Sequence, residues 1–135
     1  MEVNRRRNNK LRCAVLDTNV LMYIYLEKVD VLPQLEYLGF SKVFVPQTVV
    51  DELSRLKASL TGKERLAAKF ALRLIESGEI EVIETEKKGD SALLEVAEKY
   101  GCYLITNDKS LRKRAKDLGI PFGYIREMNR VEIVE

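Results

Sequence analysis

Four acidic residues stand where apolar segments of the chain end, and their oxygen atoms could bind a hard metal ion. Asp17 follows the apolar run CAVL, and Asp108 follows YLITN. Glu52 lies in VPQTVVDELSRL and Asp90 in KKGDSALLEVA. Carboxylates brought together repel one another by about 1–4 kcal/mol per pair at ~4 Å, depending on the dielectric. The chain either tolerates that cost or binds a cation among these acids.

The chain contains no histidine, which removes several kinds of catalytic site. Ser-His-Asp and Cys-His arrangements, histidine general bases and imidazole metal ligands are all excluded. Catalysis therefore has to depend on carboxylates, lysine, hydroxyl groups or a metal ion. Mg²⁺ and Mn²⁺ prefer oxygen ligands, so the four acids suit either ion.

Basic residues gather in two clusters, although the net charge is only +2. The first cluster contains Arg5, Arg6, Arg7, Lys10 and Arg12. The second follows Asp108 and contains Lys109, Arg112, Lys113, Arg114 and Lys116. Basic clusters beside acidic ones suggest a polyanionic substrate that cations hold while a metal ion acts on it. Either cluster taken alone is equally consistent with a solvated surface.

Strand-like and helix-like segments alternate along the chain and must position these residues. Strands are expected at 11–16, 42–45, 79–83, 102–105 and 121–125. Helices are expected at 18–27, 31–38, 46–56, 63–76, 90–100 and 110–118. This alternation predicts a three-layer α/β/α sandwich with a mostly parallel central sheet of about five strands. Residues 11–135 should form one domain after a flexible basic arm at 1–10.

The cysteines and the apolar runs indicate where the protein works. Cys13 and Cys102 lie inside apolar segments and are expected to be small buried hydrophobic residues, since a cytosolic environment disfavours a disulfide. No apolar run reaches the ~20 residues that span a bilayer. The basic start of the chain has no apolar segment typical of a secretory signal. We therefore expect a cytoplasmic protein without membrane contact.

Four segments together resemble the PIN domain family of metal-dependent nucleases. They are LDTNVLM, VPQTVVDELSRL, GDSALLEVA and ITNDKSLRKRAKDLGIP, and the resemblance extends from about Leu11 to Arg126. The last segment is most similar to archaeal members, which resemble both ribosomal-RNA-processing nucleases and the toxins of toxin–antitoxin pairs. Many family members have a second acid after the third acidic position, whereas this chain has Ser91.

The resemblance implies a role for each group of residues. Asp17, Asp90 and Asp108 would bind Mg²⁺ or Mn²⁺, and Glu52 would bind a second ion or position the water that attacks RNA. Hydroxyl and amide groups would hold these carboxylates or waters in place; they belong to Thr18, Asn19, Thr106 and Asn107. Lys109, Arg112 and Lys113 would contact RNA phosphates, and Arg5, Arg6 and Arg7 would extend that contact. The family also implies a homodimer and either an antitoxin or an RNA-processing partner protein.

Each acid also has an ordinary structural explanation. Asp17 and Asp90 are suitable helix caps, and Asp108 suits a turn. Glu52 could be a helix-surface residue, with its neighbour Asp51 taking the site role.

Other functions remain open at this point. A receiver or phosphohydrolase fits less well, because the phosphohydrolase pattern needs an acid where Asn19 stands. No glycine-rich phosphate loop follows the first strand. The main alternative is a catalytically weak or inactive module that binds RNA or protein. A dimer surface could include the apolar residues Tyr37, Leu38, Phe70 and Leu74.

Overall fold

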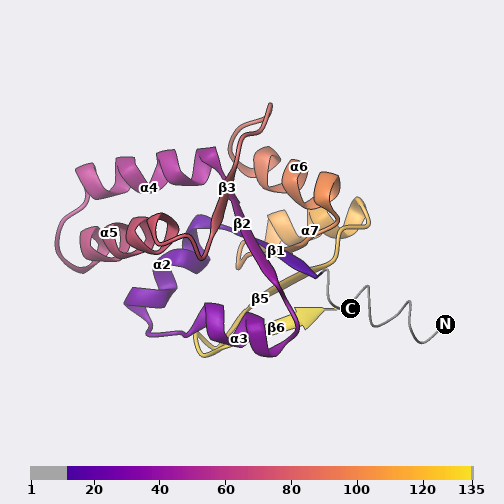
Figure 1. The fold of residues 1–135 in the computed structure, drawn as a ribbon, viewed down its shortest axis with the longest axis horizontal. Helices are drawn as coiled ribbons and strands as arrows, with labels where there is room; N and C mark the ends of the chain where they lie inside the picture. The colour runs from indigo at the N-terminus through magenta and orange to yellow at the C-terminus, as the bar shows by residue number, and fades with distance from the viewer. Residues whose placement is uncertain (1–11, 135) are drawn as a thin grey trace.

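A six-stranded sheet forms the middle of the molecule in the computed structural model, which describes residues 12–134 (Figure 1). The strand order is β3-β2-β1-β4-β5-β6, and only β5 and β6 are antiparallel. The strands are β1 (Cys13–Leu16), β2 (Lys42–Pro46), β3 (Glu81–Ile83), β4 (Tyr103–Ile105), β5 (Phe122–Arg126) and β6 (Arg130–Val134). The predicted arm at 1–10, with Arg5, Arg6 and Arg7, lies outside the described residues.

Helices cover both faces of this sheet, which confirms the predicted α/β/α sandwich. They are α2 (Thr18–Leu26), α3 (Val31–Tyr37), α4 (Gln47–Ser59), α5 (Gly62–Glu76), α6 (Asp90–Tyr100) and α7 (Lys109–Asp117). The chain moves outward from β1 to β3 and then crosses to β4 on the other side of β1. Because such crossovers are right-handed, α6 and α7 lie on the opposite face from α2 and α3. Helices α4 and α5 pack against each other, and α5 also packs against α2.

The centre of the sheet is also the centre of the hydrophobic core. All four residues of β1 are buried, as expected for a parallel strand covered on both faces. Strand β1 pairs with β2 on one side and β4 on the other. The chain adds β2 and β3 on one side of β1 and then β4 and β5 on the other side, so the strand order reverses at β1. Ligand sites of open α/β sheets form at the carboxyl ends of the strands at such a point. Asp17 is the residue that follows β1 there.

Strand β6 was not predicted. It forms a hairpin with β5, and Glu127 and Met128 in the turn have positive φ angles of 54° and 50°. Turns of this kind favour glycine or asparagine, and neither occupies these two positions. The hairpin therefore lacked its usual sequence signal. The turn closes through a bond from Asn129 N to Arg126 O at 3.0 Å.

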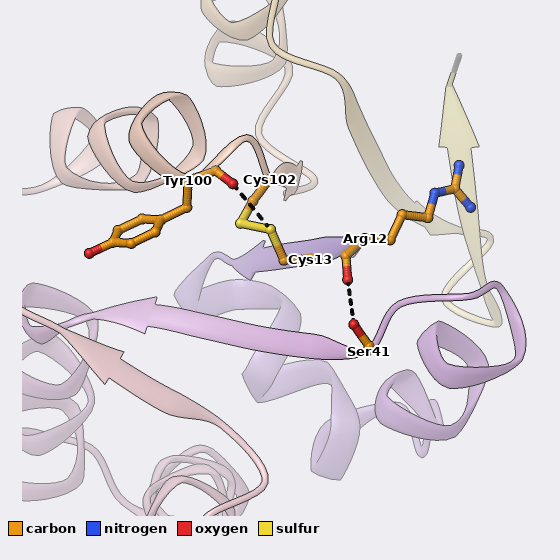
Figure 2. Close-up of a disulfide and its surroundings, with 5 residues drawn as sticks. All are labelled: Arg12, Cys13, Ser41, Tyr100 and Cys102. Atoms are coloured by element: carbon orange, nitrogen blue, oxygen red, sulfur yellow. Dashed lines mark hydrogen bonds between the residues drawn. A yellow bond between two sulfur atoms is a disulfide. The ribbon is translucent and has the colours of Figure 1, made fainter. Parts of the chain in front are cut away.

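Cys13 and Cys102 form a disulfide (Figure 2). The prediction of two unbonded thiols was therefore wrong. Both residues are buried, as predicted. Their separation is 89 residues in sequence, but pairing of β1 with β4 brings their Cα atoms to 4.8 Å. The prediction used the rule that disulfides are rare in the reducing cytosol. Intracellular proteins of hyperthermophiles are a known exception to that rule.

No helix within residues 12–134 is both long enough and apolar enough to cross a membrane.

The disulfide should contribute strongly to stability, because it closes a long loop. For a separation of 89 residues, the chain-entropy relation gives a stabilisation of about 4–5 kcal/mol at 25 °C, as an upper value. We expect the Cys13→Ala/Cys102→Ala double variant to unfold at a clearly lower denaturant concentration than the oxidised protein. Urea titrations with and without a dithiol reductant measure this, and the double variant should not respond to the reductant. Equal stability of oxidised and reduced protein would contradict the prediction.

Candidate acidic active site

Asp17 occupies the junction between β1 and α2, where hydrogen bonds to its backbone and to its carboxylate hold it in place. Its backbone N–H donates to Ile105 O over 3.1 Å and so extends the β1–β4 pairing by one residue. Its carboxylate accepts from Thr18 N at Oδ1 (2.7 Å) and from Thr106 Oγ1 at Oδ2 (2.6 Å). The residue is only 9% exposed. Asp17 is thus the N-cap of α2, and the capping bond fixes the carboxylate at the carboxyl end of the central strand.

The electrostatic surroundings of Asp17 show which other acids are near it. Burial raises the pKa of Asp17, and the negative charges of Asp90 and Glu52 raise it further. The hydrogen bonds from Thr106 and Thr18 act in the opposite direction. Asp90 of α6 and Glu52 of α4 are therefore both close enough to raise the pKa of Asp17, which follows β1.

Glu52 reaches this group from the second turn of α4. Its Oε1 accepts a hydrogen bond from Thr18 Oγ1 over 2.7 Å. Thr18 therefore contacts two acids, through its backbone N–H and its hydroxyl. The neighbouring Asp51 accepts instead from Gln47 Nε2 over 3.1 Å, on the surface of α4. Of these two adjacent acids, Glu52 is the one that contacts Thr18.

Asp108 begins α7 and uses its carboxylate to cap that helix. Its Oδ1 accepts from Ser110 N at 2.9 Å, from Ser110 Oγ at 2.8 Å and from Leu111 N at 3.2 Å. These bonds, with that of the Ser110 side chain first, lower the pKa of Asp108. Its backbone N–H donates to Thr106 Oγ1 over 3.1 Å, so one hydroxyl group connects Asp108 to Asp17.

Asp90 is the first residue of α6, and here the capping prediction was wrong. The N-cap is Gly89, with a positive φ of 59°, and no side chain makes a capping bond there. A left-handed backbone favours glycine at this position. The Asp90 carboxylate therefore has no capping role at α6.

Within residues 12–134, neither Asn19 nor Asn107 forms a hydrogen bond with one of the four acids. Asn107 binds the backbone of Ile125 in β5 twice, accepting from N at 2.7 Å and donating to O at 3.0 Å. It therefore fixes the loop before α7 to the sheet. Asn19 is exposed on the first turn of α2.

The carboxylates suit a metal ion by the type of their donor atoms, not by their spacing in this structure. Within residues 12–134, no three His, Cys, Asp or Glu side chains stand close enough together to form a metal site. Two of the acids are instead bonded to protein groups: Glu52 accepts from Thr18 Oγ1, and Asp108 accepts from the first turn of α7. The donors are nevertheless all oxygen, and the acids raise the pKa of the buried Asp17. Such a donor set suits Mg²⁺ or Mn²⁺.

Arg112 and Lys113, two basic residues of α7, have partners within the chain. Arg112 donates from Nη1 to Thr106 O over 3.1 Å, and its guanidinium lies 4.7 Å from the centre of the Tyr124 ring. This residue supports the loop that carries Thr106, a role that the sequence did not suggest. Lys113 forms a surface ion pair with Asp117 at 3.9 Å.

The apolar residues proposed for a dimer surface divide into two groups. Tyr37 and Phe70 are exposed, at 90% and 39% respectively. Leu38 and Leu74 pack against the hydrophobic core instead. Within the described chain, only the first two of the four present a large apolar side chain to solvent.

Comparisons with known proteins agree with this architecture. A family model described as a PIN like domain matches residues 14–128. Ribonuclease VapC9 of Archaeoglobus fulgidus is 58% identical over 131 residues, which cover 97% of this chain and 96% of that protein. Ribonuclease VapC4 of Methanocaldococcus jannaschii is 32% identical over 124 residues, covering 88% and 94%.

Solved structures show the same fold. The PIN domain endonuclease Utp24 superposes with a TM-score of 0.71 at 20% identity, over 90% of each chain. VapBC2 from Rickettsia felis, bound to a DNA fragment from its promoter, superposes with a TM-score of 0.50 at 18% identity. That match covers 75% of this chain and 92% of the other.

The raised pKa of Asp17 predicts that its charge opposes folding. The folded protein holds a proton on Asp17 more readily than the unfolded chain does, so stability falls as the pH rises through that pKa. We expect Asp17→Asn to raise the melting temperature at neutral pH by a few degrees. The gain should shrink as the pH falls and wild-type Asp17 becomes protonated. Thermal unfolding across this pH range measures both effects.

Asp108→Asn is the matched control for this measurement. The pKa of Asp108 is lowered, so its charge favours folding and should support stability at neutral pH. The control variant should therefore lose stability there. A destabilised Asp17→Asn protein at neutral pH, or a gain that grows in acid, would contradict the prediction.

Proposed function

Because the chain belongs to the PIN-like domain family, we propose that it is a divalent-metal-dependent endoribonuclease that hydrolyses phosphodiester bonds in RNA. The observation that carries this proposal is the buried Asp17, which lies beside Asp90 and Glu52 at the carboxyl end of the central strand. Two relatives that match nearly the whole chain are named ribonucleases, which supports the same activity.

The residues of the chain would divide the work of hydrolysis. Asp17, Asp90 and Asp108 would hold the ion, and Glu52 would hold a second ion or position the attacking water. A bound Mg²⁺ or Mn²⁺ supplies Lewis acidity and positive charge for attack of water on the phosphate. Thr18 and Thr106 keep the acids in place through their hydroxyl groups, which are bonded to Glu52 and Asp17. Lys109, Arg112 and Lys113 of α7 would attract the RNA backbone, and Arg5, Arg6 and Arg7 would extend the contact.

We further propose that the protein acts in the cytoplasm as the toxin of a toxin–antitoxin pair. The relatives named VapC and the solved VapBC2 complex support this choice. An RNA-processing role, with a processing partner, is the second candidate, and the similarity to Utp24 is the observation that favours it. A homodimer remains part of the proposal, with Tyr37 and Phe70 as exposed apolar residues that could contribute to it.

Cleavage of RNA by the purified protein tests the enzymatic proposal. We expect single-stranded or structured RNA to be cut with Mn²⁺ or Mg²⁺, and a chelator to stop the reaction. Asp17→Asn, Glu52→Gln and Asp90→Asn should each lower the rate about 100-fold or more, because each removes a carboxylate from the site. Gel analysis of labelled RNA measures this.

Asp51→Asn provides the matched control, since this acid is adjacent to Glu52 but bonded to Gln47. It should cut at close to the wild-type rate. Calorimetric titration with Mn²⁺ should show binding to the wild type and weaker binding to Asp17→Asn. A wild-type protein that binds no divalent ion and cuts nothing across a broad RNA panel would refute the proposal and favour an inactive binding module.

Growth of a bacterial host separates the two biological roles. Expression of the wild-type toxin should slow growth, whereas Asp17→Asn should not, because growth arrest requires RNA cleavage. Co-expression of the protein encoded by the neighbouring gene should restore growth if that protein is the antitoxin. Normal growth with soluble, active protein would favour the processing role instead.

A further inference from the structure

Arg114 is a cation of α7 whose side chain reaches toward the acidic site. Its Nη2 donates a hydrogen bond to Ser91 Oγ over 3.3 Å, which links α7 to the first turn of α6. Ser91 directly follows Asp90, and Asp90 is close enough to Asp17 to raise its pKa. The guanidinium therefore contacts the residue next to Asp90, while Arg114 itself remains exposed to solvent.

The partner of Arg114 distinguishes it from other cations on the same helix. Arg112 is bonded to Thr106 O and lies against an aromatic ring. Lys113 is paired with the carboxylate of Asp117. The bond from Arg114 goes to a neutral hydroxyl, and no ion pair joins it to a carboxylate among residues 12–134. Its hydrogen bond therefore positions the charge without neutralising it.

Helix electrostatics alone do not explain the direction of this side chain. A cation in the last turn of α7 favours that helix, which accounts for the residue type. The N-terminus of α6, however, carries a positive partial charge, so a guanidinium gains nothing from that helix dipole. An anion between the two would be attracted by both.

We propose that Arg114 binds the RNA phosphate at the acidic site and that Ser91 holds its guanidinium in position. Carboxylates repel the phosphate that the site must receive, and a cation at their edge offsets that repulsion. The guanidinium has five N–H donors in a planar fork, so it can bind a phosphate with two of them while another contacts Ser91. This inference rests on the proposed ribonuclease function, and it adds a substrate-binding residue to that site.

Two measurements on variants of the full chain test the role of Arg114. The first is the kcat and KM of RNA cleavage with Mn²⁺; the second is binding of fluorescent single-stranded RNA in EDTA, where no cleavage occurs. Arg114→Ala should lower kcat/KM about tenfold or more and weaken metal-free RNA binding several-fold. Arg114→Lys should recover part of both losses, because it keeps the charge but not the fork.

Lys99→Ala is the matched control, because this exposed lysine lies in the last turn of α6, at the other end of that helix from Ser91. It should stay within about twofold of the wild type in both measurements. Ser91→Ala should change both values in the same direction as Arg114→Ala, by less, and should add nothing in the Arg114→Ala background. Melting temperatures close to that of the wild type will confirm that the variants are folded.

The outcomes separate this inference from the function on which it rests. A wild-type protein that cuts RNA, together with an Arg114→Ala variant that behaves like Lys99→Ala, would overturn the role of Arg114 and leave the ribonuclease function intact. Additive effects of the Ser91 and Arg114 substitutions would overturn the positioning role of Ser91. If the wild type cuts no RNA, the proposed function fails and the role of Arg114 fails with it.

Discussion

Burial of one carboxylate at the end of the central strand pair is the constraint on which the rest of this site depends. A charged group taken out of water is costly unless hydrogen bonds compensate it. The Asp17 carboxylate receives two such bonds. One comes from the backbone of the next residue, Thr18, and the other from the hydroxyl group of Thr106 after the neighbouring strand. Because Thr106 follows β4, the compensation exists only when β1 and β4 are paired in this register. Folding of the sheet and formation of the site are therefore one event.

The surroundings of this strand pair hold it at both ends. At one end, the Cys13–Cys102 disulfide joins the two segments directly (Figure 2). At the other, Asn107 attaches the loop after β4 to Ile125, and Arg112 binds the carbonyl of Thr106. The polar site thus rests on strands and helix ends, which keep side chains in place better than mobile loops do.

The positions of Asp90 and Glu52 near the buried Asp17 oppose stability, because the negative charge of each raises the pKa of Asp17. A protein selected for stability alone would gain by losing one of these charges. A buried acid with a raised pKa, close to other acids at the carboxyl ends of parallel strands, is typical of functional sites. The cations of α7 have distinct partners: Arg112 supports the loop that carries Thr106, whereas Arg114 is bonded to the neutral hydroxyl of Ser91 in α6.

The order of strands and helices through β5 and the α/β/α fold could be predicted from the sequence, because hydrophobic periodicity is a local signal. The positions of the four acids at segment ends made them candidates for a site. The β5–β6 hairpin escaped prediction, since Glu127 and Met128 are not typical of its turn. Which acids lie together, how Thr106 joins Asp17 to Asp108, and where Arg114 points were decided only by the tertiary structure. The same is true of the disulfide between residues 89 positions apart. Contacts of this kind depend on strand register and on how helices from distant segments meet, and a one-dimensional pattern does not contain that information.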